Sequence, residues 1–464
     1  MKDANIVSRV RSRTFLAAAL ASFGVCAFVI ACSGSANSGL FGNANGGPDG
    51  GPSVDPEGGP VPEGGNGDGS KPCSGIECNK PTCKDGETTS LRGKVYDPAG
   101  ANALHGVLVY VPSGPLAALA KGAACNACGT ITPAPLTLTK TNAKGEFELR
   151  DVPVGAAVPI VIQTGKWRRT IEVSITKSCT ANDAPDHQLR LPKNGSEGDM
   201  PHIAVTAGGC DALECLLRLI GVDDKEFVPG ASTAGHIHVF NGGGGLFPGA
   251  PAAGGTALDP VGELWNSAAK MSAYDTLLLS CECSETNENK GGSAPGARQA
   301  MHDYANAGGR VIATHYHYTW FKSSPQADWQ GLSSWIPSPT GGSAGIYDVD
   351  TSFPRGKAFS DWLVAVNAST TPGQIQLTDV TNSLSSVNPP AQSWIKKTND
   401  QVRYFSFEAP IGGAACGEVA FTDLHAMGVG AGGGAFPSGC PATAGLTAQQ
   451  KALEFLVFDL ASCK

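Results

Sequence analysis

Apolar and polar residues alternate with a period of two along residues 90–192. Leu91 and Val95 fall on one side of the first such segment, and Arg92 and Lys94 fall on the other, as expected for a half-buried β-strand. Further short strands are predicted at residues 107–111, 137–141, 147–149, 158–163 and 170–175, with a turn at residues 142–145. Short strands at this regular spacing predict an all-β sandwich over residues 90–197.

The pattern changes near Pro201, where strand-like and helix-like segments begin to alternate. An apolar strand at residues 202–207 is followed by a helix at residues 213–220, which Gly221 ends. Further strands are predicted at residues 237–240, 274–280, 310–315, 402–407 and 418–425, and further helices at residues 264–271, 295–307, 359–367 and from a capping box at Thr447. This alternation predicts a doubly wound, flavodoxin-like parallel sheet over residues 198–464, so the chain is expected to be multidomain.

The first 32 residues have the pattern of an export signal. Arg9, Arg11 and Arg13 precede an apolar stretch at residues 15–30, which is short for a transmembrane helix. The stretch ends in Val-Ile-Ala-Cys at residues 29–32, which resembles a bacterial lipobox. The resemblance implies cleavage of residues 1–31, a lipid anchor on Cys32 and, because Ser33 rather than Asp follows, an outer-membrane location. The alternative is an ordinary secretory signal that is cleaved elsewhere.

Residues 32–72 are rich in Gly and Pro and contain almost no apolar side chains. Because such a segment cannot bury a core, we predict a disordered tether with a reach of about 35 Å. Removal of residues 1–31 leaves 29 basic and 40 acidic residues, a net charge of −11. Since the basic residues do not form a cluster, a nucleic-acid partner is not expected.

Thirteen cysteines remain after Cys26 leaves with the signal and Cys32 takes the lipid. An exported protein matures in an oxidising compartment, where disulfides are the default, and the odd number requires a free thiol or a bond between chains. Residues 73–89 are predicted to form a small knot through Cys73, Cys78 and Cys83, with a metal site as the alternative. Cys125 and Cys128 are predicted to form a local disulfide, with zinc as the alternative.

Residues 90–197 resemble a carboxypeptidase-regulatory-like domain. The matching segments are Gly-Lys-Val-Tyr-Asp at 93–97, Gly-Val-Leu-Val-Tyr-Val at 106–111, Thr-Asn-Ala-Lys-Gly-Glu-Phe-Glu-Leu at 141–149 and Val-Pro-Val-Gly at 152–155. The resemblance implies a transthyretin-like β-sandwich that serves as a spacer or binding module and carries no catalytic residues.

Residues 198–464 resemble class I glutamine amidotransferase-like proteins. A strand follows paired glycines and runs Arg-Val-Ile-Ala-Thr-His at 310–315, but the nucleophile-elbow position of that family holds His315 instead of a cysteine. A histidine there is more similar to the ThuA-like branch, whose later Gly-x-Val-Phe motif is partly matched by residues 417–425. The glycine before His425 is missing, Asp423 stands two before it, and residues 322–398 diverge. The resemblance therefore implies the fold without glutaminase chemistry.

Strand-end histidines are the candidate site residues. His315 and His425 would both end parallel strands, whose carboxyl ends converge on a ligand crevice. They are the candidate catalytic residues, and His315, Asp423 and His425 together are the candidate ligands of a divalent metal. Tyr316, His317 and Trp320 are the candidate binding residues, because aromatic side chains suit sugar stacking. The alternative is that all of these side chains only support the local structure.

Two further groups of residues are candidates for a site. His236-Ile-His238 and His315-Tyr-His317 each place two imidazoles on one side of an extended segment. Cys281 and Cys283 follow the strand at residues 274–280; a pairing of each with Cys210, Cys215 or a loop cysteine is expected, and a nucleophilic Cys281 is the alternative.

These features lead to three hypotheses. The first is a non-catalytic or weakly catalytic envelope lipoprotein, held on the membrane through Cys32, whose α/β domain binds a carbohydrate or another envelope component; no cofactor is expected, with a divalent metal as the alternative. The second is an enzyme that acts on a sugar or glycan through His315 and His425, with Asp423 as base or metal ligand. The third is a structural surface protein whose crevice is vestigial.

Overall fold

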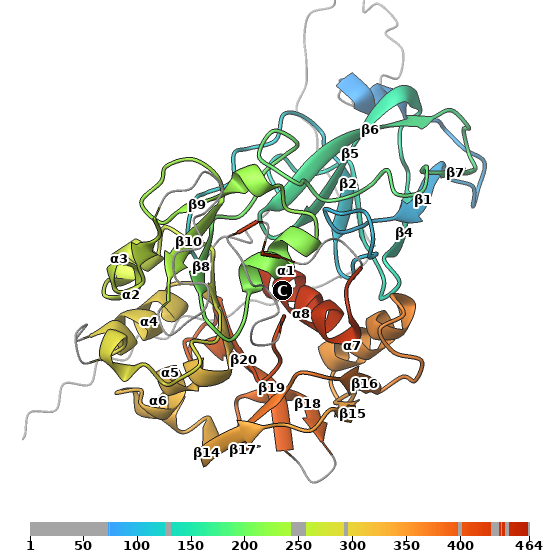
Figure 1. Ribbon diagram of the computed structural model, residues 1–464. Helices are drawn as coiled ribbons and strands as arrows, with labels where there is room; N and C mark the ends of the chain where they lie inside the picture. The colour runs from blue at the N-terminus through green and yellow to red at the C-terminus, as the bar shows by residue number, and fades with distance from the viewer. Residues whose placement is uncertain are drawn as a thin grey trace, which may run out of the picture. The chain divides into compact units, whose positions relative to one another are not determined.

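The computed structural model describes residues 73, 75–125, 131–242, 257–291, 296–397, 401–427, 436–437, 439–440 and 445–462 (Figure 1). The predicted signal, the lipid-attachment residue Cys32 and the tether lie outside the described residues. Contacts group Lys71–Lys464 into one compact unit. Within the described part of the chain, no helix has the length and apolar character needed to cross a membrane.

The first part of this unit consists of two small sheets, which we call the sheet pair. A 3-stranded sheet has the order β4-β1-β7, and a 4-stranded sheet has the order β3-β2-β5-β6. The seven strands are β1 (Ser90–Lys94), β2 (Leu108–Val111), β3 (Thr137–Lys140), β4 (Glu146–Arg150), β5 (Gly155–Thr164), β6 (Trp167–Ile175) and β7 (Ala181–Asp183). Leu91, Val109, Leu149 and Ile160 from both sheets belong to one buried core. The predicted turn forms where Asn142 Oδ1 accepts the backbone N–H groups of Lys144 and Glu146.

The second part is built on an 11-stranded sheet, which we call the large sheet. Its order is β11-β10-β8-β12-β13-β20-β19-β18-β15-β16, with β9 paired to β10. All pairs from β11 to β20 are parallel, and the pairs from β20 to β16 are antiparallel. The strands are β8 (Ile203–Ala207), β9 (Phe227–Pro229), β10 (Ile237–Asn241), β11 (Asp259–Pro260), β12 (Thr276–Leu279), β13 (Arg310–Thr314), β15 (Gly345–Val349), β16 (Gln374–Leu377), β18 (Gln392–Lys397), β19 (Gln401–Ala409) and β20 (Gly417–Thr422).

The parallel strands are buried on both faces. On β13, Ile312 belongs to the core shared with the sheet pair, whereas Val311 and Ala313 belong to a second core on the opposite face. Helices cover both faces, as Figure 1 shows. The shared core is covered by α1 (Leu213–Leu219), α7 (Pro354–Ala365) and α8 (Ala448–Ala461); the second core is covered by α2 (Gly262–Trp265), α3 (Ala268–Met271), α4 (Ala297–Asn306), α5 (Thr319–Lys322) and α6 (Ala327–Gln330).

The described fold confirms the predicted strands and most of the predicted helices. The capping box at Thr447 is present, with the Thr447 side chain accepting the Gln450 N–H. The prediction of a single helix at residues 264–271 is wrong. The first helix, α2, ends at its C-cap Asn266, and Ser267 then caps a second helix, α3. The sheet is also mixed, whereas the prediction was a parallel sheet, because β19, β18, β15 and β16 add an antiparallel half. Part of this half comes from residues 322–398. That segment also contains β14 (Ser333–Gly341), which pairs with β17 (Thr381–Val387) outside the large sheet.

Candidate functional site

Three adjacent parallel strands each deliver one side chain to a common point. Cys281 follows β12, His315 follows β13 and His425 follows β20, and these strands are neighbours in the large sheet. One sulfur or ring nitrogen from each residue lies within 4.8 Å of the others, and Cys281 Sγ is 3.3 Å from His315 Nδ1. Parallel strands end at the same edge of a sheet, so the topology itself brings these residues together. We call this group the Cys–His–His cluster.

The backbone turns sharply at His315 to aim its ring. His315 has φ of 41°, in the left-handed region that non-glycine residues seldom adopt, and it begins the 3-10 turn His315–Tyr318. The ring lies against Tyr316, with centroids 4.0 Å apart, and against His425, with centroids 5.3 Å apart. Burial and the neighbouring His425 lower the pKa of His315 to about 3. A neutral imidazole at this position can accept a hydrogen bond or donate its lone pair to a metal.

Carboxylates surround His425. Its Nδ1 lies 3.3 Å from Asp379 Oδ1, and the Asp211 side chain accepts the backbone N–H groups of Ala426 and Met427. Burial lowers the pKa of His425, but Asp379, the Cys281 thiol and the Asp211 charge together hold that pKa well above its usual value.

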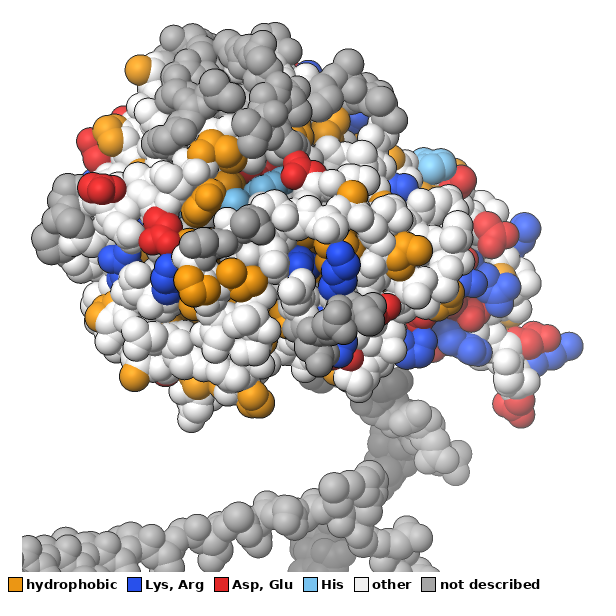
Figure 2. Space-filling view, turned by 60° about the horizontal axis from the view of Figure 1, so that its bottom comes forward, with side chains coloured by type: hydrophobic (Ala, Val, Ile, Leu, Met, Phe, Trp, Pro, Cys, Tyr) orange, Lys and Arg blue, Asp and Glu red, His pale blue; other side chains and the backbone are white. Residues whose placement is uncertain are grey.

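Several polar atoms at this edge have no hydrogen-bond partner in the described structure. They are His315 Nε2, His425 Nε2 and Asp211 Oδ2, all buried. Buried polar groups are normally hydrogen-bonded, so each of these atoms requires an explanation. Figure 2 shows histidine side chains in a hollow on one face of the molecule, with apolar and acidic side chains beside them.

Asp423 is not part of the cluster. Its carboxylate accepts hydrogen bonds from the Thr381 hydroxyl and from the Ser383 N–H, each at 2.8 Å. The Asp423 side chain is fully buried. The side chain thus fixes β17 beside the end of β20. The predicted ligand set of His315, Asp423 and His425 therefore does not come together; the side chains of the described residues that could hold a metal ion are those of Cys281, His315 and His425.

The three predicted binding residues differ in their contacts and in their exposure. His317 uses both ring nitrogens, one with the Ser280 carbonyl at 2.9 Å and one as acceptor of the Trp320 indole N–H at 3.1 Å. Trp320 is 1% exposed, so its faces are covered by protein, and Tyr316 is half-buried beside His315. His315 and His317 do not share a face because the segment is a 3-10 turn rather than an extended strand.

The other His-x-His pair lies away from the cluster. His236 Nδ1 contacts Glu226 Oε2 at 2.6 Å, and His238 Nδ1 contacts the Tyr274 hydroxyl at 3.0 Å. These contacts occupy one ring nitrogen of each histidine within the protein. Neither residue joins Cys281, His315 and His425 in the metal-competent group of the described residues.

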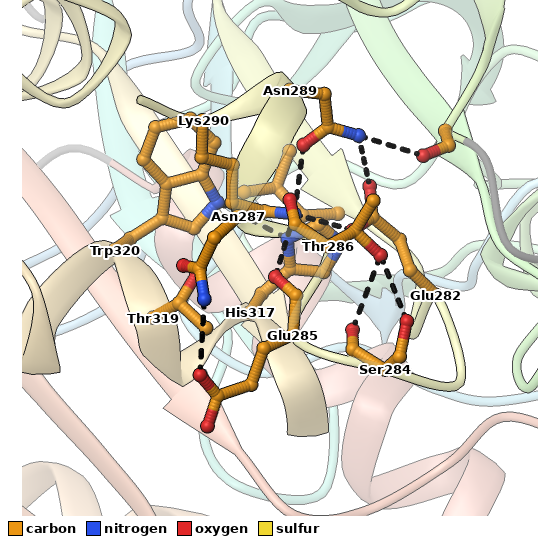
Figure 3. A network of polar contacts seen from close by, with 12 residues as sticks. Glu282, Ser284, Glu285, Thr286, Asn287, Asn289, Lys290, His317, Thr319 and Trp320 are labelled. Carbon is orange, nitrogen blue, oxygen red and sulfur yellow. Dashed lines mark hydrogen bonds and ion pairs between the residues drawn. The ribbon is translucent and has the colours of Figure 1, made fainter. Parts of the chain in front are cut away.

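A buried ion pair shapes the loop that follows Cys281 (Figure 3). Lys290 Nζ contacts the Glu282 carboxylate and donates to the carbonyl oxygens of Thr286 at 3.2 Å and Glu285 at 3.4 Å. Both side chains of the pair are at most 1% exposed, and burial raises the pKa of Glu282 to about 7. Lys290 also lies over the Trp265 ring at 5.3 Å, so the loop is held by polar and aromatic contacts together.

A disulfide and a close backbone approach hold Cys281 from the other side. Cys283 is bonded to Cys210, as one of the predicted partners, and the Cys210 N–H donates to the Cys281 carbonyl at 3.0 Å. A Cβ atom at Gly208 would overlap that carbonyl oxygen, so only glycine fits there. The end of β8 therefore supports both Cys281 and, through Asp211, the segment after His425.

The remaining cysteines of the described residues form one local pair and three pairs between residues far apart in the sequence. The other disulfides of the described residues are Cys73–Cys78, Cys83–Cys179, Cys125–Cys416 and Cys215–Cys440. The local bond predicted for Cys125 is wrong, because Cys125 is bonded to Cys416; Cys128 lies outside the described residues. Among the described cysteines, Cys281 alone is free, and it is buried.

Sequence patterns indicate Cys281 as a disulfide partner or a nucleophile, and they do not mark Asp211 or Asp379. Cys281 and Asp211 follow strands of the parallel sheet, as His315 does. Their position after a buried strand is the sequence feature that could have indicated both residues. Asp379 precedes β17 in the divergent segment, where no motif marked it.

Comparisons with known proteins give little further information. No family model matches the chain, and no curated protein matches it. Two cytoplasmic proteins of Salmonella typhimurium, STM3548 and STM1381, each share 12% identity at a TM-score of 0.29, over 56% of this chain and 98% and 96% of theirs. A cohesin–X-dockerin complex of Acetivibrio cellulolyticus matches at 15% identity and a TM-score of 0.15, over 31% of this chain and 78% of that chain. Similarities this distant define neither a fold family nor a function for this chain.

Proposed function

We propose that the chain is a lipid-anchored protein of the bacterial envelope, whose α/β region binds a carbohydrate or another envelope component at the Cys–His–His cluster. The observation that carries the proposal is the pair of buried, unpaired ring nitrogens of His315 and His425 at the carboxyl edge of a parallel sheet. Ligands of open α/β sheets bind at this edge. Hydroxyl groups of a sugar would supply the partners that these nitrogens lack.

We also propose a fold family for the large sheet and one for the sheet pair. The strand order β10-β8-β12-β13-β20 corresponds to 2-1-3-4-5 in chain order if β9 and β11 are set aside as short edge strands, which is the flavodoxin-like order. This supports a ThuA-like member of the class I glutamine amidotransferase-like group. The sheet pair, with its single core, supports a transthyretin-like spacer of the carboxypeptidase-regulatory-like type.

The anchor is tested on the N-terminal peptide of the mature protein. Mass spectrometry of the chain produced in a Gram-negative host should find cleavage before Cys32 and an acylated cysteine, and the protein should fractionate with the outer membrane. The variant Cys32→Ala should lose both properties. A mature N-terminus at another residue would contradict the lipobox interpretation.

Ligand binding is tested on the full chain in detergent with a panel of envelope glycans. His315→Ala and His425→Ala should lose binding, whereas His187→Ala, which changes an exposed histidine of the sheet pair, should keep it. Uniformly absent binding in the unaltered chain would favour the structural surface protein.

One observation favours the enzyme as a second candidate. The His425 ring contacts Asp379 through Nδ1 and lies beside the Cys281 thiol, which is the order of orienting carboxylate, base and nucleophile found in covalent catalysis. Turnover of a bound glycan by the unaltered chain, lost in Cys281→Ser and His425→Ala, would support this candidate over simple binding.

A further inference from the structure

We propose that Cys281, His315 and His425 hold a thiophilic transition-metal ion such as Zn²⁺, with one coordination position left open for the ligand. This inference rests on the same site as the proposed function and specifies how that site binds. It also replaces the ligand set expected from the sequence, because the sulfur of Cys281 takes the place of the Asp423 carboxylate.

The distances fit a single ion. Zinc lies about 2.3 Å from sulfur and about 2.0–2.1 Å from imidazole nitrogen, so two such ligands in a tetrahedron are about 3.5 Å apart. Cys281 Sγ and His315 Nδ1 are 3.3 Å apart, and all three donor atoms lie within 4.8 Å of one another. Small movements of the side chains would therefore complete the coordination.

The residues are buried, and one ring nitrogen of each histidine lacks a partner. Cys281 is 0%, His425 5% and His315 7% exposed, so each side chain is more than nine-tenths buried. Nε2 of each histidine has no hydrogen-bond partner. Two desolvated imidazoles beside a desolvated thiol would be costly without a common partner, and a metal ion would bind the thiol and one nitrogen of each ring, that of His315 being Nδ1, which faces the sulfur.

The surrounding charges favour a cation and orient its ligands. Asp379 contacts His425 Nδ1, which is the carboxylate–histidine arrangement that fixes the ring of a metal ligand. Asp211 is fully buried beside the same ring, and one of its oxygens has no partner. The two carboxylates would offset the charge of a divalent ion bound to one thiolate and two neutral imidazoles.

The donor set selects the kind of metal. One sulfur and two imidazole nitrogens suit Zn²⁺, Co²⁺ or copper, whereas Mg²⁺ and Ca²⁺ take oxygen ligands. Three protein ligands with an open position are typical of zinc sites that bind water or substrate, while structural zinc sites are closed by four. The free thiol fits this role, since ten other described cysteines are bonded in disulfides and Cys281 is not.

The test is titration of the metal-free full chain in detergent with Co²⁺ and then Zn²⁺. We expect one equivalent of Co²⁺ to give the visible bands of a tetrahedral ion and a sulfur-to-cobalt charge-transfer band, and Zn²⁺ to displace it. Cys281→Ser should lose the charge-transfer band, and His315→Ala or His425→Ala should weaken binding by more than about 100-fold, beyond the effect of losing a supporting residue. The control His187→Ala should bind as the unaltered chain does.

Two results would overturn the inference: no uptake of Co²⁺ or Zn²⁺ by the unaltered chain at micromolar metal, or a Co²⁺ complex without a sulfur band. Both are read on the unaltered chain, so they do not depend on the folding of a variant. Glycan binding is measured separately with and without metal. Glycan binding without metal uptake would retain the proposed function and refute the metal site, whereas metal uptake without glycan binding would do the reverse.

Discussion

Oδ1 of Asp379 lies 3.3 Å from Nδ1 of His425, although the two residues come from different strand connections, 46 residues apart. Asp379 precedes β17, and His425 follows β20. The contact lowers the pKa of Asp379, and it fixes which nitrogen of His425 faces Cys281 and His315. The orientation of the cluster thus depends on a residue outside the cluster.

The variant Asp379→Asn should therefore weaken Zn²⁺ binding by about 10- to 100-fold, the usual effect of removing a carboxylate that supports a metal-bound histidine. Competition with a chromogenic chelator measures the change. Asp361→Asn, which alters an exposed carboxylate paired with Lys357 on α7, is the matched control. Equal affinities in the two variants would show that Asp379 does not position His425.

The disulfide between Cys210 and Cys283 should protect Cys281. The double variant Cys210→Ser/Cys283→Ser should lower the free energy of unfolding by about 2–4 kcal/mol, because the bond closes a long loop. It should also speed alkylation of Cys281 in the native protein, as read by mass spectrometry of the peptide. The double variant Cys83→Ser/Cys179→Ser opens a loop of similar length in the sheet pair and should leave alkylation of Cys281 unchanged.

The buried pair of Glu282 and Lys290 should be costly to break from one side. Lys290→Met leaves an unpaired carboxyl in the interior and should lower the free energy of unfolding by about 3–5 kcal/mol. Adding Glu282→Gln should recover part of that loss in the same denaturation experiment. The more exposed pair of Lys322 and Glu285 provides the comparison, and Lys322→Met should cost less than about 1 kcal/mol. Similar losses for both lysines would argue against the importance of burial.

A carboxyl pair between the sheet pair and α8 should make stability depend on pH. Asp97 is 1% and Glu454 0% exposed, and Asn102 Nδ2 donates to Glu454 Oε2 at 2.7 Å. Burial raises the pKa of both carboxyls, and the neighbouring Asp97 raises that of Glu454 further. The folded chain therefore retains a proton that the unfolded chain loses. The stabilisation is complete below the unfolded pKa values, about 4, and is lost as the pH rises through the folded values.

The thermal midpoint of the unaltered chain should accordingly fall with rising pH above about 4. Glu454→Gln supplies a permanent N–H donor and should reduce this pH dependence, whereas Glu172→Gln on the exposed side of β6 should leave it unchanged. Lys451, one turn before Glu454, remains in both variants. Identical pH profiles for the unaltered chain and Glu454→Gln would show that Glu454 does not retain the extra proton of the folded chain.

The order of the elements follows from local sequence patterns, and so does the sheet edge that holds the candidate site. Period-two and helical patterns are local properties, so Leu91, Val95 and the capping box at Thr447 could be interpreted without knowledge of contacts. His315 and His425 were found because each follows a buried strand. Parallel strands must end at one edge, so their proximity was predictable in outline.

Which side chains meet at that edge depends on contacts between segments that are far apart in the sequence. Asp423 and Cys281 both follow or end strands of the same sheet, yet Asp423 turns to Thr381 and Ser383 on β17, and Cys281 faces His315. The direction of each side chain depends on the turn at the end of its strand and on which neighbouring segment offers hydrogen bonds. Neither property produces a periodic pattern in the sequence. Likewise, Cys125 pairs with Cys416 rather than locally because a disulfide requires proximity in space, not in sequence.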